Sequence, residues 1–348
     1  MMKVLLKANA SINTADQHGN TATFFAAQEG QAQALAFLIT AKADVNATTT
    51  QFQYTPTIVA AESGRALAVG LLVAGKADVE RRALNRETAL FKAASHGHID
   101  TVQVLLFDAN ANVDVFEDSQ GRTPVAVTAK NGDIATLSIL ISAKADVNIR
   151  TFGDSTPLSI AIEKGNVGVM NLLVTAKANI NAQCFGFSDQ TTPLLYAVES
   201  RNIAAVQLLL NAKAEVDKTT DRDPETTPLC LAARQGLPAV LNLLIKAKAD
   251  INKGNPVRNA VMPEYRVNSS GALGVLIAAK ANIDKPYGRD GTTPAFVAAQ
   301  RGNTTLVSNL SQAKADMNRP AHSGTTPTAI LAAAAAVRRL HPQKKTRK

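Results

Sequence analysis

The sequence predicts an all-α repeat solenoid, and two recurring patterns with one shared period support this fold class. Thr-Pro pairs recur along the chain, and so do segments resembling Lys-Ala-Asp-Val-Asn. Such a period is typical of stacked helical units that contact only their neighbours. The Thr-Pro pairs begin at Thr55, Thr123, Thr156, Thr192, Thr227, Thr293 and Thr326. The alanines of the second pattern, 32 to 36 residues apart, are Ala10, Ala43, Ala77, Ala111, Ala145, Ala178, Ala214, Ala249, Ala281 and Ala315.

Residues 156–181 show how one unit forms. The Thr156 hydroxyl can cap a helix, and Pro157 fits the first helical position because no N–H is needed there. Gly165 tolerates the left-handed conformation that ends this helix, and a second short helix follows. Neither helix can bury its apolar face alone, so neighbouring units must stack. The apolar faces consist of Leu158, Ala161, Ile162, Val169, Leu172 and Leu173.

These units resemble the ankyrin repeat. Residues 227–233 read Thr-Pro-Leu-Cys-Leu-Ala-Ala and residues 97–100 read Gly-His-Ile-Asp, both close to motifs of that family. Its Ala-Asp-Val-Asn segment occurs at residues 43–46 and 145–148. The resemblance covers residues 1–337 and implies stacked helix-turn-helix units with projecting hairpin loops. It also implies that a partner binds on the concave side.

Two departures from the family pattern carry structural expectations. The histidine that the family places after Leu in the first helix is missing from every copy, so its hydrogen bond must be replaced or lost. The glycine at the end of the second helix is mostly lysine, which must then adopt a left-handed conformation at some cost. These lysines are Lys42, Lys76, Lys144, Lys177, Lys213, Lys248, Lys280 and Lys314, with Asn9 and Asn110 in two further copies.

The repeat pattern divides the chain into three parts. Residues 1–13 form a partial N-terminal repeat, residues 14–337 the ankyrin array, and residues 338–348 a basic tail predicted to be disordered. Residues 253–284 form a degenerate repeat, in which Asn259-Ala260 replaces Thr-Pro and Pro263 should interrupt the first helix. Its second helix is expected at 273–277. Residues 326–337 form a C-terminal half repeat.

Composition and motif searches argue against catalysis, cofactors and membrane insertion. No run of about 18 apolar residues is present, so no membrane-spanning helix is expected. Cys184 and Cys230 are too few for a disulfide framework, which indicates a reducing location in the cytoplasm or the nucleus. His96 and His98 flank a turn glycine, and zinc needs three or four ligands. No phosphate-binding glycine loop occurs, so we expect no catalytic residue, no cofactor and no metal.

Aromatic and arginine side chains gather in the predicted loops, where no core requires them. Both types are enriched at binding hot spots, so a row of stacked loops could form one contact surface. The alternative is that each aromatic ring packs on the neighbouring loop. The candidate partner-binding residues are Phe52, Tyr54, Arg81, Arg82, Arg86, Phe116, Arg122, Arg150, Phe152, Phe185, Phe187, Arg222, Tyr287 and Arg289.

The sequence therefore predicts a monomeric, non-catalytic scaffold that binds a protein or peptide on its concave surface of loops and first helices. One alternative is the recognition module of a larger enzyme, channel or ubiquitin-ligase adaptor. Another is nucleic-acid binding through residues 338–348, which supply six of the nine net positive charges. The row of eight lysines is interpreted as structural, because a cation is favourable at a helix C-terminus. The alternative is that these lysines form a track for an acidic partner.

Overall fold

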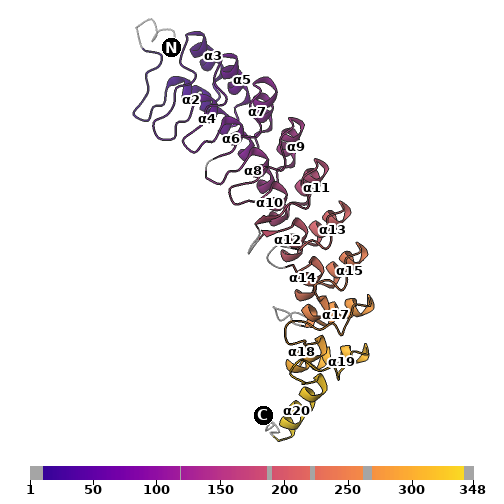
Figure 1. Ribbon diagram of the computed structural model, residues 1–348. Helices are drawn as coiled ribbons and strands as arrows, with labels where there is room; N and C mark the ends of the chain where they lie inside the picture. The colour runs from indigo at the N-terminus through magenta and orange to yellow at the C-terminus, as the bar shows by residue number, and fades with distance from the viewer. Residues whose placement is uncertain (1–10, 118, 186–189, 220–223, 262–268, 341–348) are drawn as a thin grey trace, which may run out of the picture. The chain divides into compact units, whose positions relative to one another are not determined.

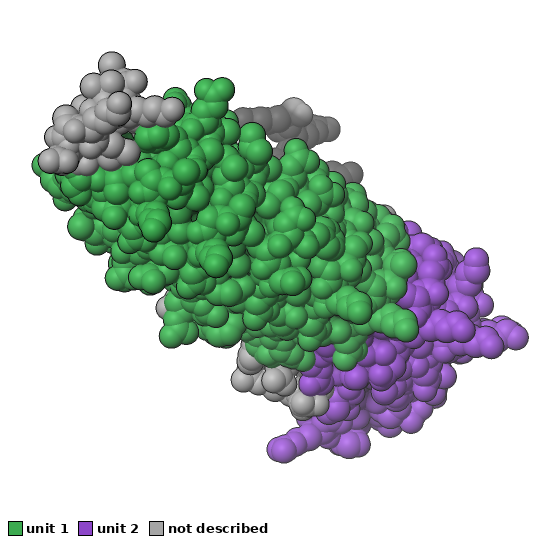
Figure 2. Space-filling view, turned by 90° about the horizontal axis from the view of Figure 1, so that it is seen from above, with its two compact units in different colours: residues 1–179 green, residues 180–348 purple. Residues whose placement is uncertain are grey.

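The computed structural model describes residues 11–117, 119–185, 190–219, 224–261 and 269–340. Two compact units divide the chain, residues 1–179 and residues 180–348 (Figure 2). Each unit stacks pairs of short antiparallel helices in an inner and an outer layer (Figure 1). This confirms the predicted all-helical repeat fold.

Unit 1 contains five such pairs in the described part of residues 1–179. The inner helices contact one another in order, and so do the outer ones. The inner helices are α2 (Ala22–Gln28), α4 (Pro56–Glu62), α6 (Ala89–His96), α8 (Pro124–Asn131) and α10 (Pro157–Lys164). The outer helices are α3 (Ala32–Thr40), α5 (Ala66–Ala74), α7 (Ile99–Gln103), its continuation η1 (Val104–Asp108), α9 (Ile134–Ser142) and α11 (Val167–Thr175).

Unit 2 repeats the arrangement and adds a short hairpin. Its strands β1 (Cys184–Phe185) and β2 (Gln190–Thr191) pair antiparallel. The inner helices are α12 (Pro193–Glu199), α14 (Pro228–Arg234), α16 (Pro256–Val261), α18 (Pro294–Gln300) and α20 (Pro327–Leu340). The outer helices are α13 (Ile203–Asn211), α15 (Pro238–Lys246), α17 (Ser269–Ala278) and α19 (Thr304–Gln312). Helix α20 extends through residues 338–340, and residues 341–348 lie outside the described residues.

Threonine caps start the inner helices other than α16, as predicted. The Thr156 side chain accepts a hydrogen bond from the Ser159 backbone N–H at 3.2 Å, and the Ser159 hydroxyl contacts the Thr156 backbone N–H in return. Ser159 stands at the position of the family histidine, which most copies replace with an apolar residue. Cys230 stands there too, and its thiol donates to the Lys253 carbonyl oxygen at 3.3 Å. In these two repeats, the side chain at this position thus still forms a hydrogen bond.

A left-handed residue ends each outer helix, as the sequence predicts. The eight lysines have φ between 61° and 67°, and Asn110 has φ of 53°. Each lysine side chain lies exposed at a helix C-terminus, where a cation is favourable. One leucine four residues earlier fills the core between the layers in every copy. These leucines are Leu38, Leu72, Leu106, Leu140, Leu173, Leu209, Leu244, Leu276 and Leu310.

One outer helix contains an extra residue. Twelve residues separate Gly165 from Lys177, but thirteen separate Gly97 from Asn110. The helix absorbs the insertion by widening into the π-helical segment η1, in which the Ala109 N–H bonds the Val104 carbonyl oxygen at 3.1 Å. Most π-helical segments are single turns of this kind within an α-helix.

The first helix of the degenerate repeat starts earlier than predicted. Asn255-Pro256, and not Asn259-Ala260, occupies the Thr-Pro position, because the Asn255 side chain accepts from the Arg258 backbone N–H at 3.2 Å. The amide oxygen replaces the threonine hydroxyl as the helix cap. Pro263 lies outside the described residues, and α17 includes the predicted segment 273–277.

A side-chain-to-backbone ladder fixes the spacing of successive repeats. We call the four residues after each left-handed position the exit segment. The side chain of its fourth residue accepts a hydrogen bond from the backbone N–H of the second residue of the next exit segment, at 2.7–3.0 Å. The acceptors are Asn13, Asn46, Glu80, Asp114 and Asn148 in unit 1, and Asn181, Asp217, Asn252 and Asp284 in unit 2.

Replacing Asp114 tests the ladder. Burial, together with the nearby Asp146 carboxylate, raises the pKa of Asp114 above its ordinary value of 3.8, so the free energy of unfolding falls as pH rises from 3.8 through the raised pKa. Asp114→Asn keeps the oxygen acceptor and removes the charge, so its melting temperature at neutral pH should equal or exceed that of the wild type. Asp114→Ala should instead cost about 1 kcal/mol. Equal destabilisation by both variants, measured by thermal unfolding, would disprove this role of the side-chain oxygen.

Candidate protein-interaction surface

The hairpin loops between exit segments and inner helices, here called fingers, hold most of the predicted contact residues. Phe52 is 54% exposed and Phe152 is 65% exposed, although both are large apolar side chains. The exposed arginines are Arg81, Arg82, Arg86, Arg150 and Arg289, while Tyr54, Arg122 and Tyr287 are half-buried and Phe116 is exposed. Phe187 and Arg222 lie outside the described residues, and Phe185 contributes backbone to β1.

The fingers that carry Phe116 and Phe152 contact each other. The Phe116 and Phe152 rings meet edge to face with centroids 5.8 Å apart, and the Phe152 backbone N–H bonds the Gln120 carbonyl oxygen at 2.8 Å. Gly121, at φ of 65°, lies beneath the Phe152 ring, where a Cβ would come within 2.4 Å of it. Phe152 is therefore fixed in place by the adjacent finger and still presents most of its surface to solvent.

A pocket of about 600 Å³ lies beside these rings in unit 1. Side chains of the inner helices α8 and α10 line it together with the finger residues Ser119, Gln120, Arg122, Thr151, Phe152, Gly153 and Ser155. The helix side chains are Lys130, Ile160, Glu163 and Lys164. Its size falls in the range of binding pockets, and it combines an aromatic wall with several charged groups.

Arg122 is held in this pocket by a buried carboxylate. Its Nε lies 3.2 Å from Oε1 of Glu117, a side chain that is 2% exposed. The backbone N–H groups of Ser119 and Gln120 also donate to Glu117, at 2.6 and 2.8 Å. Burial alone raises the pKa of Glu117, but hydrogen bonds from Ser119, Gln120 and Arg122 outweigh it and lower that pKa to about 2. The finger is thus built around an ionised Glu117.

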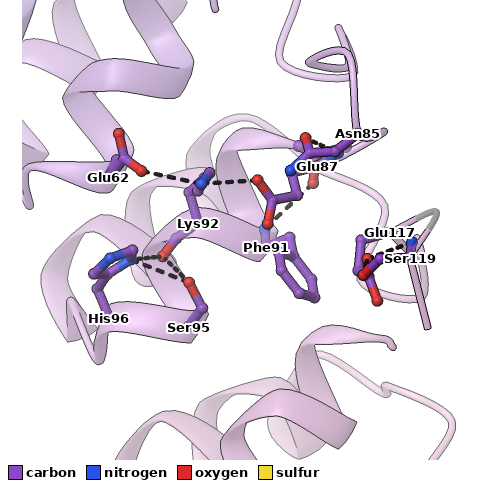
Figure 3. Close-up of polar contacts among 10 residues, drawn as sticks. Glu62, Asn85, Glu87, Phe91, Lys92, Ser95, His96, Glu117 and Ser119 are labelled. Carbon is purple, nitrogen blue, oxygen red and sulfur yellow. Dashed lines mark hydrogen bonds and ion pairs between the residues drawn. The ribbon is translucent and has the colours of Figure 1, made fainter. Parts of the chain in front are cut away.

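Figure 3 shows a second charge cluster, in which Lys92 lies between Glu62 of α4 and Glu87, which precedes the cap of α6. Lys92 of α6 is buried, and its Nζ lies 2.7 Å from Oε2 of Glu87 and 3.0 Å from Oε1 of Glu62. The same Nζ lies 5.2 Å from the centroid of the Tyr54 ring. Burial disfavours the charged amine, but hydrogen bonds to Glu87, Tyr54 and Glu62 outweigh it and raise the pKa of Lys92. Lys92 thus ties one finger ring to two inner helices.

In unit 2, one arginine replaces the family histidine and contacts a finger ring. Arg258 of α16 lies with its guanidinium carbon 3.8 Å from the centroid of the Tyr287 ring, a cation–π contact. The exposed Arg289 accepts through its backbone oxygen a hydrogen bond from His322 Nδ1 at 2.6 Å. Cys230 is buried, and burial raises the pKa of its thiol. The contact with Arg258 thus anchors the Tyr287 ring, as neighbouring residues anchor the rings of unit 1.

The turn histidines make backbone contacts. His98 Nε2 lies 2.9 Å from the Glu62 carbonyl oxygen, and His96 Nδ1 lies 2.9 Å from that of Lys92. His98 links two repeats in this way, as Asn166 does by donating to the Ala129 carbonyl oxygen at 3.0 Å.

Among the described residues, no helix is long and apolar enough to cross a membrane.

Sequence reasoning found the fingers but missed the charged side chains of the inner helices. Lys92 could have been noticed, because the equivalent helix position holds Val59, Val127 and Val297 in other repeats. Lys130, Glu163 and Lys164 gave no such signal, because charged residues are common near helix ends. Only the fold brings them beside Phe152.

The stacked helix pairs with projecting fingers define a helical-repeat protein. A family model described as ankyrin repeats (three copies) matches residues 33–117, 57–151, 109–184 and 158–255. These stretches cover more than half of the 348 residues, so the chain belongs to the ankyrin-repeat family. Ankyrin repeats generally mediate protein–protein interactions, and the family is typically non-catalytic. No curated protein matches the chain.

The Lys92 cluster yields a stability prediction. Lys92→Met leaves Glu87 and Glu62 without their cation and should lower the free energy of unfolding by about 2 kcal/mol. In a background carrying Glu87→Gln, the same change should cost less, since one of the two carboxylates is already neutral. Chemical denaturation of the wild type, the two single variants and the double variant measures these costs. Lys144→Met, at an exposed position, serves as the control, and an equal cost in both backgrounds would exclude coupling.

Glu117 should produce a defined pH dependence. Its pKa of about 2 lies below the ordinary value of 4.5, so its stabilising contribution is present above pH 4.5 and is lost as pH falls toward 2. Glu117→Gln should be less stable than the wild type by about 2 kcal/mol at neutral pH. That difference should shrink when unfolding is measured at about pH 3. A difference that stays constant between the two pH values would contradict an ionised, hydrogen-bonded Glu117.

Proposed function

We propose that this chain is a non-catalytic scaffold that binds a protein or peptide partner on the finger and inner-helix surface. One observation carries the proposal: Phe152 and Phe52 are large aromatic side chains held in place by their own or neighbouring fingers, yet more than half exposed. A fixed aromatic ring loses little conformational entropy on binding, which favours its use as an anchor.

The surroundings of these rings support the same proposal. Exposed arginines accompany the aromatic residues on the fingers, and the pocket of about 600 Å³ adjoins Phe152. Aromatic and arginine side chains contribute most of the binding energy in many protein interfaces. The combination of rigid apolar anchors and exposed cations fits a protein surface better than a small enclosed ligand.

Substituting the finger rings tests this function against a matched control. Phe52→Ala combined with Phe152→Ala should weaken capture of a discrete partner from a lysate of the source cells by at least about tenfold, since each hot-spot residue contributes 1 kcal/mol or more. Phe107→Ala is the control, because Phe107 is 56% exposed but belongs to the outer segment η1. Mass spectrometry of retained proteins at low and high salt provides the measurement.

The outcomes distinguish binding by the finger surface from binding by the basic tail. A partner retained at high salt by the wild type and by Phe107→Ala, but lost with the double variant, supports the finger surface. Equal retention by all three proteins would contradict it. Material that all three retain only at low salt, and that disappears when residues 338–348 are deleted, would instead indicate binding through the basic tail.

A further inference from the structure

The pocket beside Phe152 has a chemistry that specifies its ligand more closely than the fold does. Three cations line it, Arg122, Lys130 and Lys164, against one acid, Glu163. Glu163 pairs with Lys164 at 2.7 Å, and Arg122 is held by Glu117. Lys130 has no ion-pair partner among the described residues. The pocket therefore offers a positive charge that the protein itself leaves unpaired.

The remaining walls of the pocket are apolar and hydrogen-bonding. Phe152 and the half-buried Ile160 provide apolar surface, while Ser119, Gln120, Thr151 and Ser155 provide polar groups. A polypeptide in extended conformation presents backbone donors and acceptors that such groups can satisfy. An apolar side chain of the ligand would cover Phe152, which Gly121 supports from beneath.

From this arrangement we propose that the pocket binds an extended segment of the partner that carries an acidic and a large apolar side chain close together. The carboxylate pairs with Lys130, and the apolar side chain packs on Phe152. This inference rests on the proposed function, because it names the partner chemistry for one part of the finger surface. Cations in the lining outnumber the acid, so charge complementarity favours a negatively charged group on the ligand.

A nucleic acid fits the same pocket less well. Two of its three cations already face carboxylates, so a chain of phosphates would meet a single unpaired cation. Binding of a polyanion also depends on several phosphate contacts along a continuous basic surface. The whole of residues 1–179 carries 15 basic and 16 acidic residues, so unit 1 has no excess of positive charge.

The experiment is selection from a phage-displayed library of random linear peptides on the full chain. Peptides selected by the wild type should be enriched in Asp or Glu near Phe, Leu or Trp. A selected peptide, synthesised and titrated by fluorescence polarisation, should bind about tenfold more weakly to Lys130→Glu and to Phe152→Ala, a loss of about 1.4 kcal/mol. Lys130→Gln should show a smaller loss in the same direction.

Lys144→Glu is the matched control, because Lys144, like Lys130, is an exposed lysine near the C-terminus of a helix but lies outside the pocket. It should bind the peptide like the wild type. Melting temperatures of all variants show that they are folded, and Lys130→Gln preserves the test if Lys130→Glu is unstable.

Each result has a distinct meaning. Peptides that lack an acidic preference, or that bind Lys130→Glu as well as the wild type, overturn this inference; if Phe52→Ala and Phe152→Ala still weaken them, the proposed function stands. A selection that yields no binding peptide argues against both. Stronger Lys130-dependent binding of a single-stranded DNA oligonucleotide than of any peptide would overturn the peptide assignment.

Discussion

Alignment of the fingers depends on one recurring hydrogen bond between successive exit segments. A side-chain oxygen of one repeat accepts from a backbone N–H of the next, at 2.7–3.0 Å in both units. Because the donor is backbone and the acceptor is a short side chain, the bond fixes both distance and orientation. Apolar contacts between the layers tolerate small displacements of one repeat relative to the next, because they are not directional. The hydrogen bonds of the ladder restrict these displacements.

The ladder explains how short loops without a core can present an ordered surface. Backbone bonds between fingers, such as those from Leu84 to the Phe52 oxygen and from Phe152 to the Gln120 oxygen, form at 2.9 and 2.8 Å once the exit segments are aligned. The rings of Phe116 and Phe152 can then meet edge to face. Repetition thus places Phe116 and Phe152, which are 36 residues apart in sequence, side by side.

Departures from the repeat pattern distinguish this chain within its family. Lys92 occupies a helix position that is apolar in neighbouring repeats, and Glu62 and Glu87 compensate its burial. Glu117 organises one finger through hydrogen bonds from Ser119, Gln120 and Arg122. Lys92 contacts the half-buried Tyr54 ring, and Arg122, which Glu117 holds, lines the pocket beside the exposed Phe152. The individual character of the surface thus arises where a repeat carries a charge that its neighbours lack.

The sequence by itself determined the repeat, its helices and their caps, because these depend on local interactions with a fixed period. Left-handed lysines and threonine caps follow from residue types a few positions apart. It did not determine which charges meet, because Lys92 and Glu62 lie thirty residues apart and belong to different repeats. It also misplaced the start of α16, since Asn255 caps that helix in place of threonine. The pocket beside Phe152 was decided by stacking alone, which brings Lys130 of α8 to residues of the next repeat.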